Sequence, residues 1–245
     1  MLKNFTLHTE KDYQAMSQKA AEIFAEAVKA NPSGAFGFAT GSTPIGMYEA
    51  LIKLQEAGKA DLRGITALNL DEYFPIQPND PQSYSYFMRQ NLFEGIGLPA
   101  QNAHIPDGMA DDPIAECAAY EDKIAKAGGM DVIILGIGGN GHIGFNEPAS
   151  ELLATTSYVP LAETTIESNA RFFASPQDVP RHAITMGINS IMMARRIMLL
   201  ASGEGKANIL WAALNGPITT MVPASLLQLH RDVTVVVDEE AARYL

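Results

Sequence analysis

A short apolar run followed by closely spaced glycines constrains this chain more than any other feature. Residues Val132 to Leu135 are all large and aliphatic, which predicts a buried strand. Five glycines follow within the nine residues from Gly136 to Gly144. Glycine allows positive φ and close approach of a ligand to the backbone, and open α/β sheets bind ligands beyond the carboxyl ends of their strands. The pattern therefore predicts a ligand-binding loop at the end of a strand.

This loop also contains the side chains of an acid–base pair. His142 lies among the glycines, and Glu147 follows it by five residues, directly before Pro148. A nearby carboxylate orients an imidazole ring, and histidine is the side chain best suited to exchange protons near neutral pH. The loop by itself is equally compatible with a glycine-rich turn that carries a surface histidine, so other parts of the chain decide between the two interpretations.

The order of the predicted elements indicates an α/β fold. Apolar runs alternate with segments of helical spacing, and the chain contains no repeat, low-complexity tract or linker. This alternation predicts a mainly parallel sheet covered by helices on both faces. The predicted strands are 35–39, 65–70, 132–135, 155–159, 183–186, 197–201 and 232–237, and the predicted helices are 11–30, 44–57, 83–93, 113–127, 163–172, a short one before 197, and one that follows the turn at 202–206.

Composition narrows the class of protein. A length of 245 residues with 47% hydrophobic content is enough for one domain with a large core, and we expect residues 1–245 to form a single domain. The net charge of −11, from 17 basic and 28 acidic residues, argues against a nucleic-acid partner. No signal-like start and no apolar run of about 20 residues is present, so we expect a cytoplasmic protein without membrane attachment. The one cysteine, Cys117, has no partner for an internal disulfide.

Two predicted strand ends carry groups that suit an anion. The turn from Thr40 to Pro44 offers hydroxyls and backbone N–H groups at a helix start, with Thr43 as the expected N-cap. Lys206 is expected in the first turn of a helix, where the helix dipole disfavours a cation unless an anion is bound. Arg171 is a second candidate cation. Together these groups suit a phosphate monoester, although each one alone also fits a helix cap or a solvated side chain.

A candidate base follows another predicted strand. Asp71 comes directly after the apolar run that ends at Leu70. A partly desolvated carboxylate has a raised pKa and can remove a proton next to a carbonyl group. For the neighbouring Glu72 we favour helix capping or solvation instead.

Five segments together resemble the glucosamine-6-phosphate deaminase family, in its short bacterial type. The similarity covers nearly the whole chain in the same order. It implies a modified Rossmann-like, three-layer αβα domain that uses no cofactor and no metal, and that converts glucosamine 6-phosphate and water to fructose 6-phosphate and ammonia. The segments are Thr40 to Pro44, Asn69 to Tyr73, Gly138 to Pro148, Ser168 to Phe173 and Pro223 to His230.

The resemblance also implies roles for individual residues. Asp71 matches the base that moves a proton between C2 and C1, His142 the group that assists opening of the sugar ring, and Glu147 its carboxylate partner. Asn140 stands where some members carry Asp, but it recurs in the short type. The residues that match the phosphate site are Gly41, Ser42, Thr43, Arg171 and Lys206.

Two other sugar-phosphate enzymes of the same superfamily and one protein of a different class stay open as alternatives. They are galactosamine-6-phosphate deaminase, 6-phosphogluconolactonase and a non-catalytic sugar-phosphate sensor. Long hexameric members bind an activator through basic residues soon after the Glu-Pro pair, whereas residues 155–160 here contain no Lys or Arg. We therefore expect weak or absent activation, a small amino-sugar phosphate as the binding partner, and a monomer or small homo-oligomer. Residues 155–181 are expected to form a lid that carries Arg171.

Overall fold

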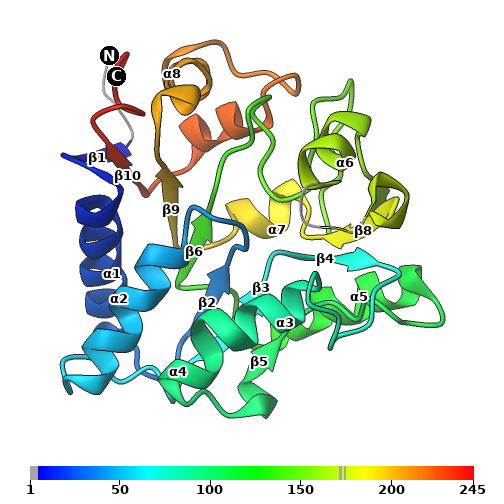
Figure 1. The fold of residues 1–245 in the computed structure, drawn as a ribbon, viewed down its shortest axis with the longest axis horizontal. Helices are drawn as coiled ribbons and strands as arrows, with labels where there is room; N and C mark the ends of the chain where they lie inside the picture. Colours follow the sequence, from blue (N-terminus) through cyan, green and yellow to red (C-terminus); the bar gives the residue numbers. More distant parts are fainter. Residues whose placement is uncertain (1–4, 171–172, 174) are drawn as a thin grey trace.

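Two sheets of different kind form the frame of the molecule. The computed structural model describes residues 5–170, 173 and 175–245. Seven strands form a sheet in the order β1-β10-β9-β6-β2-β3-β5 (Figure 1), and all of its neighbouring strands are parallel. Its strands are β1 (Phe5–Glu10), β2 (Ala35–Phe38), β3 (Thr66–Asn69), β5 (Ala103–His104), β6 (Val132–Leu135), β9 (Arg196–Ala201) and β10 (Val233–Asp238).

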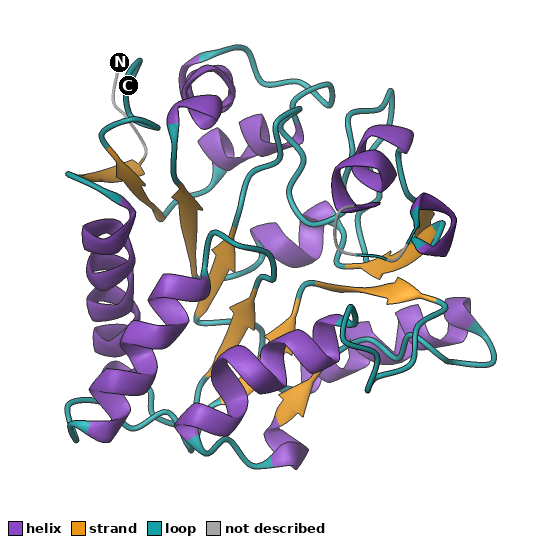
Figure 2. Cartoon of the chain, viewed as in Figure 1, coloured by secondary structure: helices purple, strands orange, loops and turns teal. Residues whose placement is uncertain are grey.

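Helices cover both faces of this sheet (Figures 1 and 2), which confirms the predicted three-layer α/β fold. The α-helices are α1 (Tyr13–Ala30), α2 (Ile45–Glu56), α3 (Tyr84–Met88), α4 (Glu94–Ile96), α5 (Pro113–Lys126), α6 (Glu163–Asn169), α7 (Ile188–Met192) and α8 (Ala207–Asn215). Because crossovers between parallel strands are right-handed as a rule, the strand order places α1, α2 and the α3–α4 segment on one face and α5, α7 and α8 on the other. The remaining helical segments are the π-helix η1 (Arg89–Phe93) and the 3-10 helices η2 (Ala100–Asn102), η4 (Pro176–Asp178), η5 (Glu204–Lys206) and η6 (Pro223–Leu229).

The central strands are apolar on both sides because both of their faces are covered. Every residue of β6 and of β10 is buried, as expected for a parallel sheet between two helical layers. The edge strand β1 was not predicted. Its sequence alternates the apolar Phe5 and Leu7 with the polar Thr6 and His8, and its residues are mostly half-buried, so it lacks the continuous apolar run of the other strands.

A change of direction in the chain places a crevice between β2 and β6. These strands are neighbours in the sheet. After β2 the chain crosses to α2 on one face, whereas the connections around β6 run through helices α5 and α7 on the other face. Such a switch point leaves the strand ends uncovered and is where doubly wound sheets bind their ligands. The loops that follow β2 and β6 are the two glycine-containing segments identified in the sequence.

The second sheet is antiparallel and was not predicted as a separate unit. It contains β4 (Asp71–Phe74), β8 (His182–Thr185) and β7 (Ser157–Pro160), in the order β4-β8-β7. Asp71 pairs with Thr185 in this register. The predicted strands at 155–159 and 183–186 exist with small shifts, but they belong to this sheet. A separate apolar cluster packs beneath it and includes Tyr73, Phe145 and Ile166.

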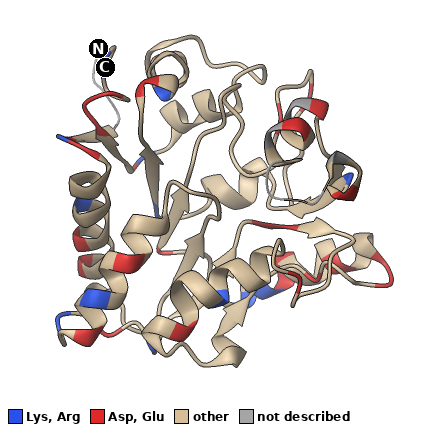
Figure 3. Cartoon of the chain, in the orientation of Figure 1, with Lys and Arg blue, Asp and Glu red and all other residues tan. Residues whose placement is uncertain are grey.

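Several predicted helices differ in detail. The helix expected at 83–93 is α3 followed by the π-helix η1, and the one expected at 163–172 is α6, which ends at Asn169. No helix in the described ranges is long and apolar enough to cross a membrane. Lys and Arg are scattered among more numerous Asp and Glu residues (Figure 3).

Candidate active site

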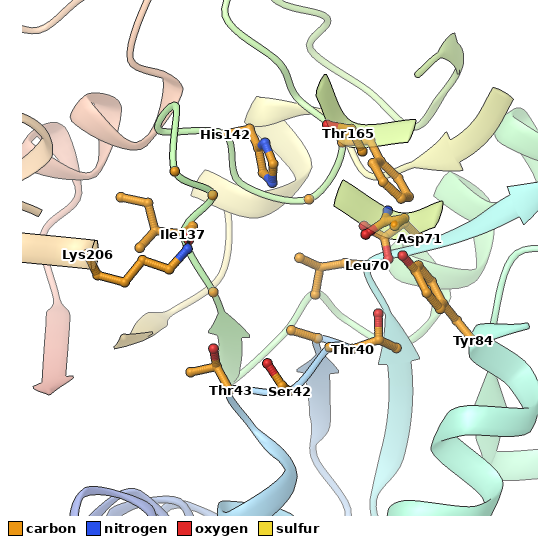
Figure 4. A pocket seen from close by; sticks show the side chains of 18 residues that line it. Thr40, Ser42, Thr43, Leu70, Asp71, Tyr84, Ile137, His142, Thr165 and Lys206 are labelled. Atoms are coloured by element: carbon orange, nitrogen blue, oxygen red, sulfur yellow. Dashed lines mark hydrogen bonds between the residues drawn. The ribbon is translucent and has the colours of Figure 1, made fainter. Parts of the chain in front are cut away.

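One cavity at the carboxyl ends of β2 and β6 brings together most of the predicted site residues. Its volume is about 340 Å³. Figure 4 shows Lys206 and Thr43 on one side, with Asp71 and Tyr84 on the opposite side and His142 between them. Arg171 lies outside the described residues. The predicted residues that line the cavity are Gly41, Ser42, Thr43, Asp71, His142 and Lys206.

Asp71 is buried at the edge of this cavity. Its residue is only 6% exposed, and burial, with a smaller contribution from the charge of Glu72, raises its pKa to about 8. The glycine loop approaches it closely, because a Cβ at Gly144 would lie 3.5 Å from Asp71 Oδ2, and Gly144 has a φ of +57°. A carboxyl group with this pKa exchanges protons in the neutral range, as a catalytic base requires.

Glu72 does not line the cavity; its carboxylate accepts hydrogen bonds from the start of α3, in agreement with the expected capping role. Its Oε1 accepts the backbone N–H groups of Tyr73 at 3.0 Å and Tyr84 at 2.8 Å, and its Oε2 accepts that of Ser85 at 2.9 Å. Tyr84 and Ser85 begin α3, so the carboxylate satisfies helix N–H groups that have no partner within the helix. Burial raises the pKa of Glu72 to about 7, although these three N–H groups lower it.

The predicted acid–base pair is assembled. His142 Nδ1 lies 3.2 Å from Glu147 Oε1. The same oxygen accepts the Thr165 hydroxyl at 2.5 Å, and Glu147 Oε2 accepts the Asn140 side-chain amide at 2.7 Å. Burial alone would raise the pKa of Glu147, but His142, with Thr165 and Asn140, outweighs it and lowers the pKa to about 2. Glu147 and Asn140 thus lie behind His142 and support it.

The glycine loop is shaped around the imidazole ring. A Cβ at position 138 would lie 2.3 Å from His142 Cε1, so only glycine leaves room for the ring there. The loop closes on itself through a hydrogen bond from the Gly138 N–H to the His142 carbonyl, at 3.0 Å. The Asn140 side-chain oxygen accepts the His142 N–H at 3.2 Å. These contacts fix the ring at the mouth of the cavity.

The second sheet anchors the far end of the same loop, which the sequence did not reveal. Buried Asn146 donates its amide to the carbonyl groups of Ile143 and Met186, both at 2.9 Å. The Thr185 hydroxyl accepts the Phe145 N–H at 3.1 Å. Thr185 pairs with Asp71 across the sheet, so β8 connects the candidate base to the loop that carries His142. Phe145 and Thr185 are 40 positions apart in sequence, as are Asn146 and Met186, so no local pattern predicts these contacts.

The opposite side of the cavity offers donors for an anion. Gly41 has a φ of +92°, and Ser42 and Thr43 precede α2. Pro44 rather than Thr43 is the N-cap of α2, and no side chain caps this helix, so the expected capping role of Thr43 is wrong. A helix start without a side-chain cap leaves N–H groups available to an anion.

Lys206 completes this side of the cavity. Its Nζ donates a hydrogen bond to the Ile137 carbonyl at 2.7 Å, and burial lowers its pKa. Tyr13 holds the turn opposite, because its hydroxyl donates to the Ser42 carbonyl at 3.1 Å and accepts the Gly46 N–H at 2.8 Å. One side of the cavity therefore carries the cation Lys206, and the other side carries Asp71.

In the part of the chain that the structure describes, no cluster of three or more His, Cys, Asp or Glu residues is suited to hold a metal ion.

Comparisons with known proteins agree with this arrangement. The family model described as glucosamine-6-phosphate isomerases/6-phosphogluconolactonase matches residues 8–236. A protein of Halothermothrix orenii named glucosamine-6-phosphate deaminase is 51% identical over 236 residues, which cover 96% of this chain and 98% of the relative. A protein of Alkaliphilus oremlandii with the same name is 49% identical over 239 residues, covering 98% and 99% of the two chains.

Solved structures show the same relationship. The structure of a monomeric glucosamine-6-phosphate deaminase has a TM-score of 0.94 and 43% identity, and the match covers 98% of this chain and 100% of that one. A 6-phosphogluconolactonase from Trypanosoma cruzi has a TM-score of 0.82 at 22% identity, which shows a common fold only. The resemblance seen in the sequence is confirmed, and the chain belongs to the glucosamine-6-phosphate isomerase/6-phosphogluconolactonase family.

Proposed function

We propose that this protein is a glucosamine-6-phosphate deaminase, which converts glucosamine 6-phosphate and water to fructose 6-phosphate and ammonia. The observation that carries the proposal is the single cavity in which buried Asp71 and the His142–Glu147 pair face a side made of Lys206 and the start of α2. Relatives of this name that are about half identical over nearly their whole length support it.

Binding of the phosphate positions the sugar in this proposal. The phosphate lies against Ser42, Thr43 and the first N–H groups of α2, and Lys206 supplies the positive charge. Gly41 lets the turn adopt the required backbone, and Arg171 is proposed as a second cation. Because the phosphate is remote from the reacting carbons, its binding energy holds C1 and C2 near the catalytic side chains.

Ring opening is assigned to His142. Its Nδ1 faces Glu147, which leaves Nε2 for the substrate. The imidazole moves the proton between the C1 hydroxyl and the ring oxygen, and the C1–O5 bond breaks to give the open-chain aldehyde. Glu147, kept charged by its low pKa of about 2, stabilises the imidazolium that forms during this transfer.

Isomerisation and loss of ammonia follow at C1 and C2. Asp71 removes the C2 proton, the electron pair moves toward the C1 carbonyl, and the carbonyl oxygen takes a proton from the protonated C2 amino group, so that an enolamine forms. The Asp71 carboxyl returns its proton to C1, which leaves a protonated imine at C2. Water adds to C2 and ammonia leaves, so one water is consumed for each ammonia released.

The segment 155–181 is proposed as a lid over the sugar, and the protein as a monomer or small homo-oligomer. Within this segment Thr165 contacts Glu147, and Asn169 donates its amide to the Tyr73 hydroxyl at 2.8 Å. Both Thr165 and Asn169 line the cavity, so α6 is already part of its wall. Similar proteolysis of this segment with and without a sugar phosphate would contradict a closing lid. The related solved enzyme described as monomeric supports the small assembly.

Ammonia release from the purified protein tests the proposed function. We expect release from glucosamine 6-phosphate, with galactosamine 6-phosphate measured in parallel to determine the preferred C4 epimer. Hydrolysis of 6-phosphogluconolactone is the third assay, because that reaction needs no base at C2. Lactone hydrolysis without ammonia release from either amino sugar would replace the proposal with the lactonase.

A further inference from the structure

A buried carboxylate outside the cavity is tied to the loop that carries Lys206. Asp238 is the last residue of β10 and is only 4% exposed. Both of its carboxylate oxygens lie 3.0 Å from the Gly203 nitrogen, and Oδ1 accepts the Ala241 N–H at 2.8 Å. Oδ2 also accepts a short hydrogen bond from the Ser202 hydroxyl. The donors are backbone N–H groups and a hydroxyl, and none of the ion pairs among the described residues includes Asp238.

These contacts act on the segment that leads into the cavity. Ser202 and Gly203 directly follow β9, and Gly203, with a φ of +88°, is the N-cap of η5. Lys206 ends η5, and its N–H donates to the Gly203 carbonyl at 3.0 Å. One tight turn therefore separates the residue held by Asp238 from the lysine that lines the cavity. A shift of Gly203 moves the Lys206 backbone with it.

A second contact joins the chain after β10 to the turn after β9, and its strength can be compared with that of the Asp238 contacts. Arg243 forms an ion pair with Glu204, and both side chains are more than half exposed. Exposed ion pairs contribute little to the stability of a fixed geometry because solvent screens them. Hydrogen bonds to a buried carboxylate are stronger and directional, and their loss leaves buried donors without partners.

We propose that Asp238 is a positioning residue for the anion-binding side of the cavity: it fixes the Ser202–Gly203 turn and thereby places Lys206. The inference rests on the proposed function in its assignment of Lys206 to the substrate phosphate. Asp238 touches neither substrate nor reacting atoms in this account, so its influence reaches the reaction only through binding.

Asp238→Asn tests this role in the full-length protein. The amide keeps the shape of the side chain but replaces one acceptor oxygen with a donor that faces the Gly203 N–H or the Ser202 hydroxyl. We expect the KM for glucosamine 6-phosphate to rise roughly tenfold while kcat stays within about twofold and the pH profile of kcat keeps its shape. Ser202→Ala, which removes one donor, should raise KM by about threefold, and Arg243→Gln should leave KM unchanged.

Inorganic phosphate supplies a readout that does not depend on turnover. We expect Asp238→Asn to need about tenfold more phosphate than the wild type for the same rise in melting temperature. If the wild type releases no ammonia but this difference in phosphate affinity is found, the proposed function fails and the inference stands. A folded Asp238→Asn variant with unchanged phosphate affinity and KM, or with a lower kcat at unchanged KM, overturns the inference. If Asp238→Asn does not fold, the phosphate affinity of Ser202→Ala is measured instead. A Ser202→Ala variant that binds phosphate as tightly as the wild type overturns the inference.

Discussion

Asp71 lines the cavity and Glu147 lies behind His142, and the surroundings of these two carboxyl groups shift their pKa values in opposite directions. Asp71 begins β4 with little around it to favour a negative charge, and burial raises its pKa to about 8. Glu147 is also largely shielded from water, but His142, Thr165 and Asn140 surround it and lower its pKa to about 2. The comparison shows that burial alone does not decide the charge of a carboxyl group, because polar partners reverse its effect. It also supports the proposed roles, since a group that titrates near neutral pH can exchange protons while one that stays charged stabilises a neighbouring cation.

The largest effect is expected from removing the group that exchanges protons. Asp71→Asn keeps the shape of the side chain but cannot accept the C2 proton, so kcat for ammonia release should fall about 1000-fold. Phosphate-induced stabilisation against heat should stay as in the wild type, because the anion-binding side is untouched. A loss of tenfold or less would show that another group acts as the base.

Removing the charge on the other carboxylate should have a smaller effect. Glu147→Gln keeps hydrogen-bonding atoms near His142 and Asn140 but no longer stabilises the imidazolium, and we expect kcat to fall about 100-fold. Glu151→Gln is the matched control, since Glu151 lies on the same loop and is exposed. Equal rates for the two variants would mean that the charge of Glu147 has no role.

The two carboxylates should also affect stability in opposite directions with pH. The pKa of Asp71 is raised from 3.8 to about 8 in the folded protein, so its contribution to the free energy of unfolding is full below about pH 4 and is lost as the pH rises through 8. Asp71→Asn removes this loss and should make the protein about 5 kcal/mol more stable than the wild type at pH 8.

The contribution of Glu147 to the free energy of unfolding changes with pH in the opposite direction. Its pKa is lowered from 4.5 to about 2, so the stability that it contributes is present above pH 4.5 and is lost as the pH falls through 2. Urea unfolding of both variants and the wild type from pH 2 to 8 checks the two signs, and parallel pH curves for Asp71→Asn and wild type would contradict the raised pKa of Asp71.

The smallest change in kcat is expected from a substitution of Asn140, which contacts the His142–Glu147 pair through Glu147. Asn140→Ala removes the amide that donates to Glu147 Oε2 at 2.7 Å, which should raise the pKa of Glu147 and lower kcat by about threefold to tenfold. Steady-state kinetics measure the loss in kcat, and carbon-13 NMR of the labelled Glu147 side chain measures the shift of its pKa. A loss as large as that of Glu147→Gln would mean that Asn140 itself takes part in the reaction.

Much of the frame followed from the sequence because its signals are local. The apolar runs of β6, β9 and β10, the helical spacing of α1 and the glycines after Leu135 each predict their own structure, and the parallel sheet follows from their alternation. The polar edge strand β1 and the π-helix η1 were missed because neither has a distinctive local pattern.

The residues of the candidate site could be predicted from the sequence, but the residues that hold them in place could not. Asp71 and His142 were proposed from the sequence because each follows an apolar run. Thr165, Asn146 and Thr185 were not, since their contacts with the loop that carries His142 depend on the antiparallel sheet and on α6. Of the groups that lower the pKa of Glu147, only Thr165 is such a distant contact, whereas His142 and Asn140 lie on the same loop as Glu147. The raised pKa expected for Asp71 was derived from its position alone.

A direct titration of the two carboxyl groups tests the central claim. Carbon-13 NMR of labelled Asp and Glu side chains, with Asp71→Asn and Glu147→Gln used to assign the signals, reports the pKa of each group in the folded protein. The account predicts that the Asp71 carboxyl titrates near pH 8 and that Glu147 stays charged down to about pH 2. Titration of both groups together near pH 4 would contradict it.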